Sequence, residues 1–245
     1  MSLLRPLAVA FAFLTRLPVR IGEAQDTEVG HASAFFPVVG FVLGLALVAA
    51  AWLLSALPHS LAAVGVVALL AVMTGGLHLD GLADVFDGLG GGHGDRERML
   101  AIMRDSRIGA HGALALILVV LAKTFAVSVA LQRNELWAVL LFPAIARWAV
   151  VLLIVAFPYV REVGLGRTFN DQVSATEVAW ATTFTAALVL WSGTRALQPT
   201  AIALGVALAF ALWMRRRLGG LTGDAYGAAI ELAEVAFLTV AARGG

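Results

Sequence analysis

The sequence contains no cysteine, and only 13% of its 245 residues are charged. Without cysteine the chain has no disulfide, no thiolate nucleophile and no thiolate metal site, so a bound metal would need oxygen or imidazole ligands. The net charge of +1 and the lack of a basic arm argue against a nucleic acid partner. In contrast, 60% of the residues are apolar and the mean hydropathy is +0.90, whereas a typical soluble domain is roughly 45–50% apolar. We therefore expect a polytopic integral membrane protein whose surface is solvated largely by the lipid bilayer.

Long apolar runs predict an all-α bundle of about seven transmembrane helices, formed by a single integral membrane domain over residues 1–245. A helix needs roughly 20 residues to span the hydrocarbon core. The predicted spans are 34–57, 61–79, 109–131, 136–157, 177–193, 199–214 and 225–242. The apolar stretch from Leu3 to Leu14 is too short to span, lacks a small-residue cleavage site and is followed by Arg16 and Arg20. We expect it to form an interfacial or re-entrant helix rather than a signal peptide.

The polar connections between these spans predict the orientation of the chain. Those on the side of the N-terminus are 1–33, 80–108, 158–176 and 215–224, and they hold 12 of the 17 Lys and Arg residues. Basic residues stay on the cytosolic side during insertion. We therefore expect a multi-pass protein of the cytoplasmic (inner) membrane whose active site faces the cytosol.

The segment 80–108, rich in acidic residues, glycine and arginine, is the predicted catalytic loop. If its beginning is helical, Asp80, Asp84 and Asp87 fall within about 60° of one another on one helix face. Carboxylates this close repel one another, and a divalent cation would remove the repulsion. Mg²⁺ commonly binds one or two carboxylates together with substrate phosphate oxygens. We therefore predict a magnesium site for a phosphorylated substrate; the alternative is a solvated acidic helix end that pairs with nearby arginines.

Asp224 is a predicted fourth ligand of this metal. The segment Gly219-Gly-Leu-Thr-Gly-Asp224 resembles Gly75-Gly-Leu-His-Leu-Asp80, and both segments place their last residue at the same cytosolic boundary. Asp224 can reach the metal if the second and seventh spans are neighbours.

Arginines in the same loop are candidates for phosphate binding, because guanidinium groups bind phosphate oxygens bidentately. These candidates are Arg98, Arg104 and Arg107. Arg104 and Arg107 would lie one helical turn apart just before the third span. The alternative is that they only anchor the loop on the cytosolic side.

Four ionisable residues fall inside predicted spans, where such groups are functional or paired by default. They are Lys123, Arg147, Glu231 and Glu234. Because the charges balance, we predict structural ion pairs. An ion-coupled transport path is the alternative.

Five motifs in order carry a resemblance to a known family over almost the whole chain. They are Phe13-Leu-Thr-Arg-Leu-Pro-Val19, Phe36-Pro-Val-Val-Gly40, Gly75-Gly-Leu-His-Leu-Asp-Gly-Leu-Ala-Asp84, Ile102-Met-Arg-Asp-Ser-Arg-Ile-Gly109 and Gly220-Leu-Thr-Gly-Asp224. With these motifs the chain resembles the cobalamin synthases, the adenosylcobinamide-GDP ribazoletransferases.

The resemblance implies the last assembly step of vitamin B12. In that reaction the 3′-hydroxyl of α-ribazole, or of its 5′-phosphate, attacks the phosphorus on the aminopropanol arm of adenosylcobinamide-GDP. GMP leaves, adenosylcobalamin or its 5′-phosphate forms, and Mg²⁺ is required. His78 and Asp105 are then candidates for the general base. The sequence leaves open whether the chain forms a homo-oligomer.

Two other functions compete with this interpretation. Asp84-Val-Phe-Asp-Gly88 reproduces the first five positions of the CDP-alcohol phosphotransferase motif D-x-x-D-G-x-x-A-R, but Gly91 and Gly92 occupy the Ala and Arg places. A secondary transporter is the second alternative. Transporters place their key groups at the membrane midplane, whereas the acidic residues are densest here at the predicted cytosolic boundary.

Overall fold

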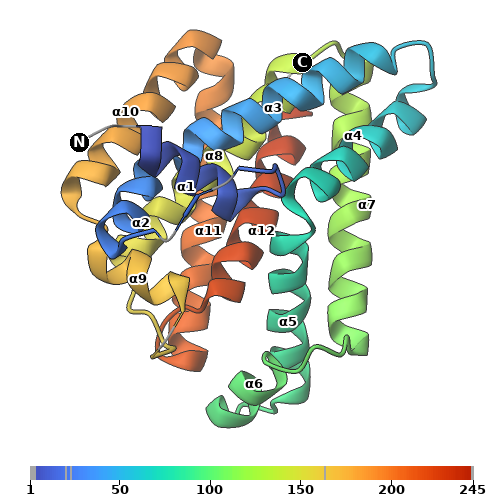
Figure 1. Ribbon diagram of the computed structural model, residues 1–245. Coiled ribbons are helices and arrows are strands. Elements are labelled where there is room, and N and C mark those ends of the chain that lie inside the picture. The colour runs from blue at the N-terminus through green and yellow to red at the C-terminus, as the bar shows by residue number, and fades with distance from the viewer. Residues whose placement is uncertain (1–3, 20, 23, 163, 244–245) are drawn as a thin grey trace.

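The computed structural model describes residues 4–19, 21–22, 24–162 and 164–243 (Figure 1). Leu3 and Arg20, which belong to the predictions above, lie outside these ranges. In order, the elements are α1 (Leu4–Leu14), α2 (Asp26–Ala32), the 3₁₀ turn η1 (Ser33–Phe35), α3 (Phe36–Leu53), α4 (His59–Thr74), α5 (Leu77–Gly91), α6 (Arg96–Ile102), α7 (Ala110–Gln132), α8 (Leu136–Ala156), α9 (Leu165–Gln172), α10 (Ala175–Ser192), the 3₁₀ turn η2 (Thr194–Ala196), α11 (Leu197–Leu218) and α12 (Gly223–Ala241). The predicted all-α fold is confirmed.

Each of the seven predicted spans corresponds to a helix in the structure. By length and composition, four helical stretches are apolar enough to cross a membrane, namely Asp26–Leu53, Ala110–Gln132, Leu136–Ala156 and Thr194–Leu218. Two bent pairs, α4 with α5 and α9 with α10, raise the number to six if each pair forms one span. A seventh span stays a prediction.

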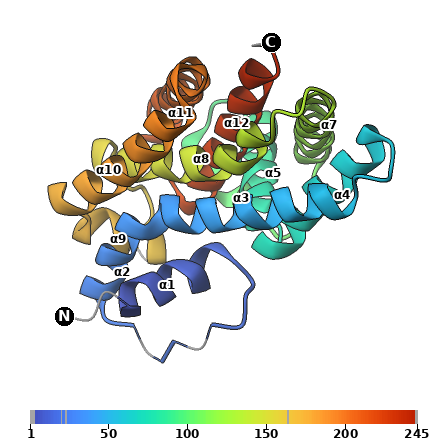
Figure 2. The same cartoon turned by 90° about the horizontal axis from the view of Figure 1, so that it is seen from above.

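The helix α12 lies at the centre of the bundle, between α5, α7, α8 and α11 (Figures 1 and 2). Its small residues, such as Ala225, Ala229 and Ala233, are completely buried, which allows neighbouring backbones to approach. Large apolar side chains point outward instead: Trp52 on α3, Phe125 on α7 and Leu190 on α10 are 69–77% exposed. Small residues in the interior and large apolar residues on the outside suit a protein whose periphery faces lipid.

The helix is interrupted between α4 and α5, whereas the sequence predicts one continuous span over residues 61–79. Gly75 and Gly76 both adopt positive φ angles, +62° and +70°, which residues with a side chain rarely adopt. They end α4 and turn the chain by 88° into α5. The predicted end of the second span is therefore wrong by five residues, and most of the segment 80–108 is helical, in α5 and α6.

The predicted cytosolic connections other than residues 1–33 lie toward one end of the molecule. In Figure 1, α6, α9 and the turn between α11 and α12 lie toward the lower end, away from the C-terminus. A hydrogen bond from Arg96 Nε on α6 to the carbonyl oxygen of Leu218 at the end of α11 (2.7 Å) ties two of these segments together. The helix α5, which carries Asp80, Asp84 and Asp87, runs toward this end.

Candidate active site

The helix α5, which follows the predicted second span, packs against α12, the helix of the seventh span, whereas α4 packs mainly on α7 and α3. A Cβ atom added at Gly81 would lie 2.8 Å from the backbone oxygen of Asp224, and one added at Gly227 would lie 3.2 Å from the Cα of His78. Glycine is required at such a close approach of two backbones. This contact brings Asp224 next to the acidic face of α5.

Gly81→Ala is expected to lower substrate turnover at this candidate active site by one to two orders of magnitude, since shifts of about 1 Å at a reacting centre can cost roughly 100-fold. The added methyl group would push α5 away from the Asp224 backbone. Gly205→Ala on α11 is the matched control, because a Cβ atom there meets nothing within 4 Å. Equal turnover of the two variants would show that the close contact does not position the site.

Arg161 is a site residue that the sequence analysis did not identify. Its Nη2 atom contacts Oδ2 of Asp224 at 2.5 Å, and both side chains are partly buried. A short parallel bridge positions it: Val160 N–H donates to the carbonyl of Leu221 (2.8 Å), and Leu221 N–H donates to that of Pro158 (2.9 Å). This pairing joins the segments before α9 and before α12, and no local sequence pattern signals it.

A polar hollow of about 450 Å³ opens beside α5. Among its lining residues are Asp80, Asp84, Arg16, Ser106 and Arg107. It therefore combines two carboxylates with two guanidinium groups, and Asp84 also interacts electrostatically with Asp224 and Arg161. The structure thus brings Asp80, Asp84 and Arg107, three of the predicted residues, to one cavity.

Asp87 does not line this polar hollow. Its carboxylate accepts hydrogen bonds from the backbone N–H groups of Gly109 (2.7 Å) and Gly112 (2.8 Å) at the beginning of α7. A carboxylate at a helix N-terminus satisfies amide groups that have no partner within the helix. In the structure Asp87 therefore anchors α7 to α5, and its predicted role as a metal ligand stays untested.

The segment 103–109, which contains two of the predicted phosphate-binding arginines, is not helical. The Asp105 carboxylate accepts hydrogen bonds from the backbone N–H and the guanidinium of Arg107, and such local bonds compete with helix formation. The sequence predicts that Arg104 and Arg107 lie one helical turn apart. This prediction is wrong, because neither residue is in a helix. Arg104 and Arg98 are exposed and line neither the polar hollow nor the cavity described next.

Asp105 is poorly suited to be the general base. Hydrogen bonds from Arg107 lower the pKa of its carboxyl group from 3.8 to about 2. The pairing is therefore complete above pH 4 and is lost only as the pH falls through about 2. A carboxylate with so low a pKa accepts a proton weakly at neutral pH.

A second cavity, the aromatic hollow, has a volume of about 260 Å³ and lies between α1, α3, α5, α8, α9 and α12. Phe13, Phe36 and Phe169 form one part of its wall, with ring centroids 4.9–5.9 Å apart. Tyr159 and Tyr226 stack at 6.1 Å and also line it. Asp80, Asp224 and Arg161 contribute charged groups to the same cavity. Asp80 and Leu77 line both hollows, so the two cavities adjoin at the beginning of α5, a place called the junction below.

A magnesium ion at this junction would need ligands from the substrate in addition to those from the protein. Among the described residues, no three His, Asp or Glu side chains form a ready-made metal site. Asp80 and Asp84 nevertheless supply two carboxylates to one polar hollow. Mg²⁺ typically takes one or two carboxylates and completes its shell with water and substrate phosphate oxygens. The residues present therefore fit a cation that binds together with a phosphorylated substrate.

Comparison with known proteins decides the family. The family described as cobalamin-5-phosphate synthase matches residues 6–242. The chain belongs to the cobalamin-5-phosphate synthase family. Three similar relatives are each named adenosylcobinamide-GDP ribazoletransferase: one from Pseudomonas aeruginosa (41% identical over 244 residues, 98% of each chain), one from Ectopseudomonas mendocina (42% over 235 residues, 94% of this chain and 95% of the relative) and one from Syntrophobacter fumaroxidans (42% over 239 residues, 96% of each chain). No solved structure matches.

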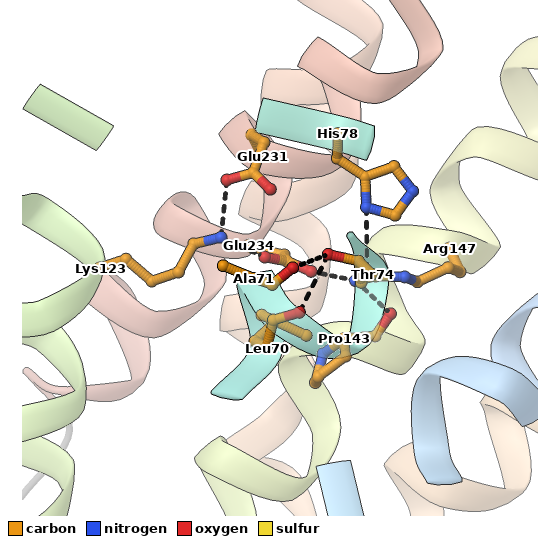
Figure 3. A network of polar contacts seen from close by, with 9 residues as sticks. All are labelled: Leu70, Ala71, Thr74, His78, Lys123, Pro143, Arg147, Glu231 and Glu234. Atoms are coloured by element: carbon orange, nitrogen blue, oxygen red, sulfur yellow. Dashed lines mark hydrogen bonds and ion pairs between the residues drawn. The ribbon is translucent and has the colours of Figure 1, made fainter. Parts of the chain in front are cut away.

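Membership of the cobalamin-5-phosphate synthase family agrees with the resemblance seen in the sequence. It leaves the CDP-alcohol phosphotransferase and transporter alternatives without support. The buried charges that suggested transport are structural ion pairs, as predicted: Lys123 Nζ contacts Glu231 at 2.7 Å and Glu234 at 2.5 Å, and Arg147 pairs with Glu234 (Figure 3).

Proposed function

We propose that this protein is an adenosylcobinamide-GDP ribazoletransferase that uses Mg²⁺ and works at the cytosolic side of the cytoplasmic membrane. The family and the names of relatives that align with nearly the full chain support the activity. The observation that carries the assignment of the site is the position of Asp80, which lines both the polar and the aromatic hollow. A transferase needs two substrates to meet at one reacting centre, and this junction provides such a place.

The proposed reaction forms one P–O bond and breaks another. The ribose 3′-oxygen of α-ribazole, or of its 5′-phosphate, attacks the phosphorus that carries the aminopropanol arm of adenosylcobinamide-GDP. The bond from that phosphorus to the GMP oxygen breaks, and GMP leaves with the bonding electron pair. The hydroxyl proton passes to a carboxylate that does not hold the cation; Asp80, Asp84 and Asp224 are the available acceptors.

Charge neutralisation and positioning dominate this type of chemistry. Arg16 and Arg107 in the polar hollow are placed to bind diphosphate oxygens. Arg161 holds Asp224 in position, so it acts on the site through that carboxylate. When bound at Asp80 and Asp84, Mg²⁺ would neutralise the charge of the diphosphate.

The test is a product assay with the full chain purified in detergent. With adenosylcobinamide-GDP, α-ribazole and Mg²⁺, we expect GMP and a cobalamin to appear in equal amounts, and no GMP when α-ribazole is omitted. Excess EDTA should stop the reaction, and added Mg²⁺ should restore it. If folded protein releases no GMP under these conditions, the assignment is wrong, and CDP-alcohol substrates become the next ones to test.

A further inference from the structure

The imidazole of His78 contacts a buried network of charged side chains (Figure 3). Glu234 on α12 pairs with both Lys123 of α7 and Arg147 of α8, and Lys123 also pairs with Glu231. All four charged side chains are at most 5% exposed. The network therefore fixes the Arg147 guanidinium in position, and this group also reaches His78, with 3.1 Å between Nη2 and Nδ1.

This contact determines which ring nitrogen of His78 carries the proton. A guanidinium group can only donate hydrogen bonds. Nδ1 of His78 must therefore be the acceptor, so the neutral imidazole carries its proton on Nε2. In this tautomer Nε2 is a hydrogen-bond donor and cannot act as the general base that the sequence suggested.

The Nε2–H group has no partner among the described residues, although His78 is only 3% exposed. An unsatisfied buried donor is rare, because burial without a hydrogen-bond partner is energetically unfavourable. His78 lines the aromatic hollow, and so does Tyr226, whose hydroxyl also lacks a partner. The hollow therefore offers a ligand aromatic walls and two unpartnered polar groups, with carboxylates at its junction with the polar hollow.

We propose that the aromatic hollow binds the base of the nucleoside substrate, and that His78 recognises an acceptor nitrogen of that base through Nε2–H. The proposal rests on the proposed function, which makes α-ribazole a substrate. The base of this nucleoside is a substituted benzimidazole, a planar apolar ring system with one unsubstituted acceptor nitrogen. A base held in this way would keep its ribose in or next to a cavity that Asp80 also lines.

The hollow suits this base better than the guanine of the second substrate. Guanine carries several donors and acceptors on its edges, each of which would need a partner, and the Phe, Leu, Val and Ile side chains of the wall supply none. A benzimidazole needs a single donor, and Nε2–H of His78 supplies it. The corrinoid itself is too large for a cavity of about 260 Å³.

The first test uses the wild-type full chain in detergent and measures nucleoside binding by calorimetry, without the second substrate. The ligands are α-ribazole and its indole analogue, in which the acceptor nitrogen is replaced by CH. We expect the analogue to bind about tenfold more weakly, the factor for one lost hydrogen bond to a buried donor. Equal affinities would overturn the proposal. GMP release is measured in a separate assay. A failure of the proposed transferase activity can therefore be distinguished from a failure of the proposal that the aromatic hollow binds the base.

The second test compares two conservative variants. In H78Q the longer side chain can place its amide N–H donor near the position of Nε2. In H78N the shorter side chain can place its amide oxygen, an acceptor, near the position of Nδ1, toward Arg147. We expect H78Q to keep most of the preference for α-ribazole over the analogue. H78N should lose this preference and show about a tenfold higher KM for α-ribazole, with the KM for adenosylcobinamide-GDP unchanged.

A purely structural role of His78 as the partner of Arg147 would reverse this order, since H78N would then be the milder variant. A rise in the KM for adenosylcobinamide-GDP instead of α-ribazole would assign the hollow to guanosine. Either result would overturn the proposal. Melting curves of both variants check the fold, and the analogue comparison on the wild type does not depend on them.

Discussion

Replacing Asp80 by asparagine is expected to lower the kcat of GMP release by about 10³-fold, the order of effect seen when a transition-state charge loses its electrostatic support. Asp80 is the carboxylate that lines both hollows, so its charge acts on both substrates. Asparagine has nearly the same shape but cannot neutralise a cation or accept a proton. The measurement is single-turnover GMP release at saturating substrates, which separates the chemical step from binding.

Asp171→Asn is the control for this variant. Asp171 lies in the same group of polar connections and forms an exposed i,i+4 pair with Arg167, and such pairs contribute little to stability. Its substitution should leave kcat within about twofold of the wild type. If Asp80→Asn retains kcat while its melting curve is unchanged, the reacting centre is not at the junction of the two hollows.

Lys123→Met is expected to destabilise the protein by roughly 3–5 kcal/mol, because it leaves an uncompensated charge in a buried site. Lys123 is 3% exposed and is the ionic partner of both Glu231 and Glu234. Arg147 still pairs with Glu234 in the variant, so Glu231 becomes the unpaired group. Unfolding by a denaturing detergent, followed by the far-UV signal, measures the loss.

The double variant Lys123→Met with Glu231→Gln tests the cause of this destabilisation. Replacing the unpaired Glu231 carboxylate by an uncharged amide should restore at least half of the lost stability. Replacing both members of a buried ion pair costs much less than removing one of them. Additive losses in the double variant would mean that packing around Lys123, rather than charge balance, accounts for the effect.

Much of the helical architecture could be predicted from the sequence, because helices in lipid must be long, apolar and internally hydrogen-bonded. The contact of Asp224 with the acidic helix and the pairing of Lys123 with Glu231 and Glu234 were also within reach of the sequence. In each case a polar group inside an apolar segment needs a partner, and few partners are available.

The features that the sequence did not predict depend on contacts between distant segments. Arg161 meets Asp224 only because a two-residue bridge joins Pro158–Val160 to Leu221. The carboxylate of Asp87 is occupied by amides at the beginning of α7, which lie 22 and 25 residues away along the chain. The aromatic hollow is formed by residues of six helices and leaves no local pattern that could reveal it.

Binding of Mn²⁺ as a magnetic substitute for Mg²⁺ tests the central claim most directly, since carboxylate and water ligands suit both ions. The measurement is the electron paramagnetic resonance of Mn²⁺ titrated into the wild type and into Asp80→Asn, with and without adenosylcobinamide-GDP. We predict that the wild type binds Mn²⁺ tightly when this substrate is present, and that Asp80→Asn binds it at least tenfold more weakly, in line with the loss of one charged ligand. The same Mn²⁺ affinity in both proteins would contradict a metal-assisted transfer at the junction of the two hollows.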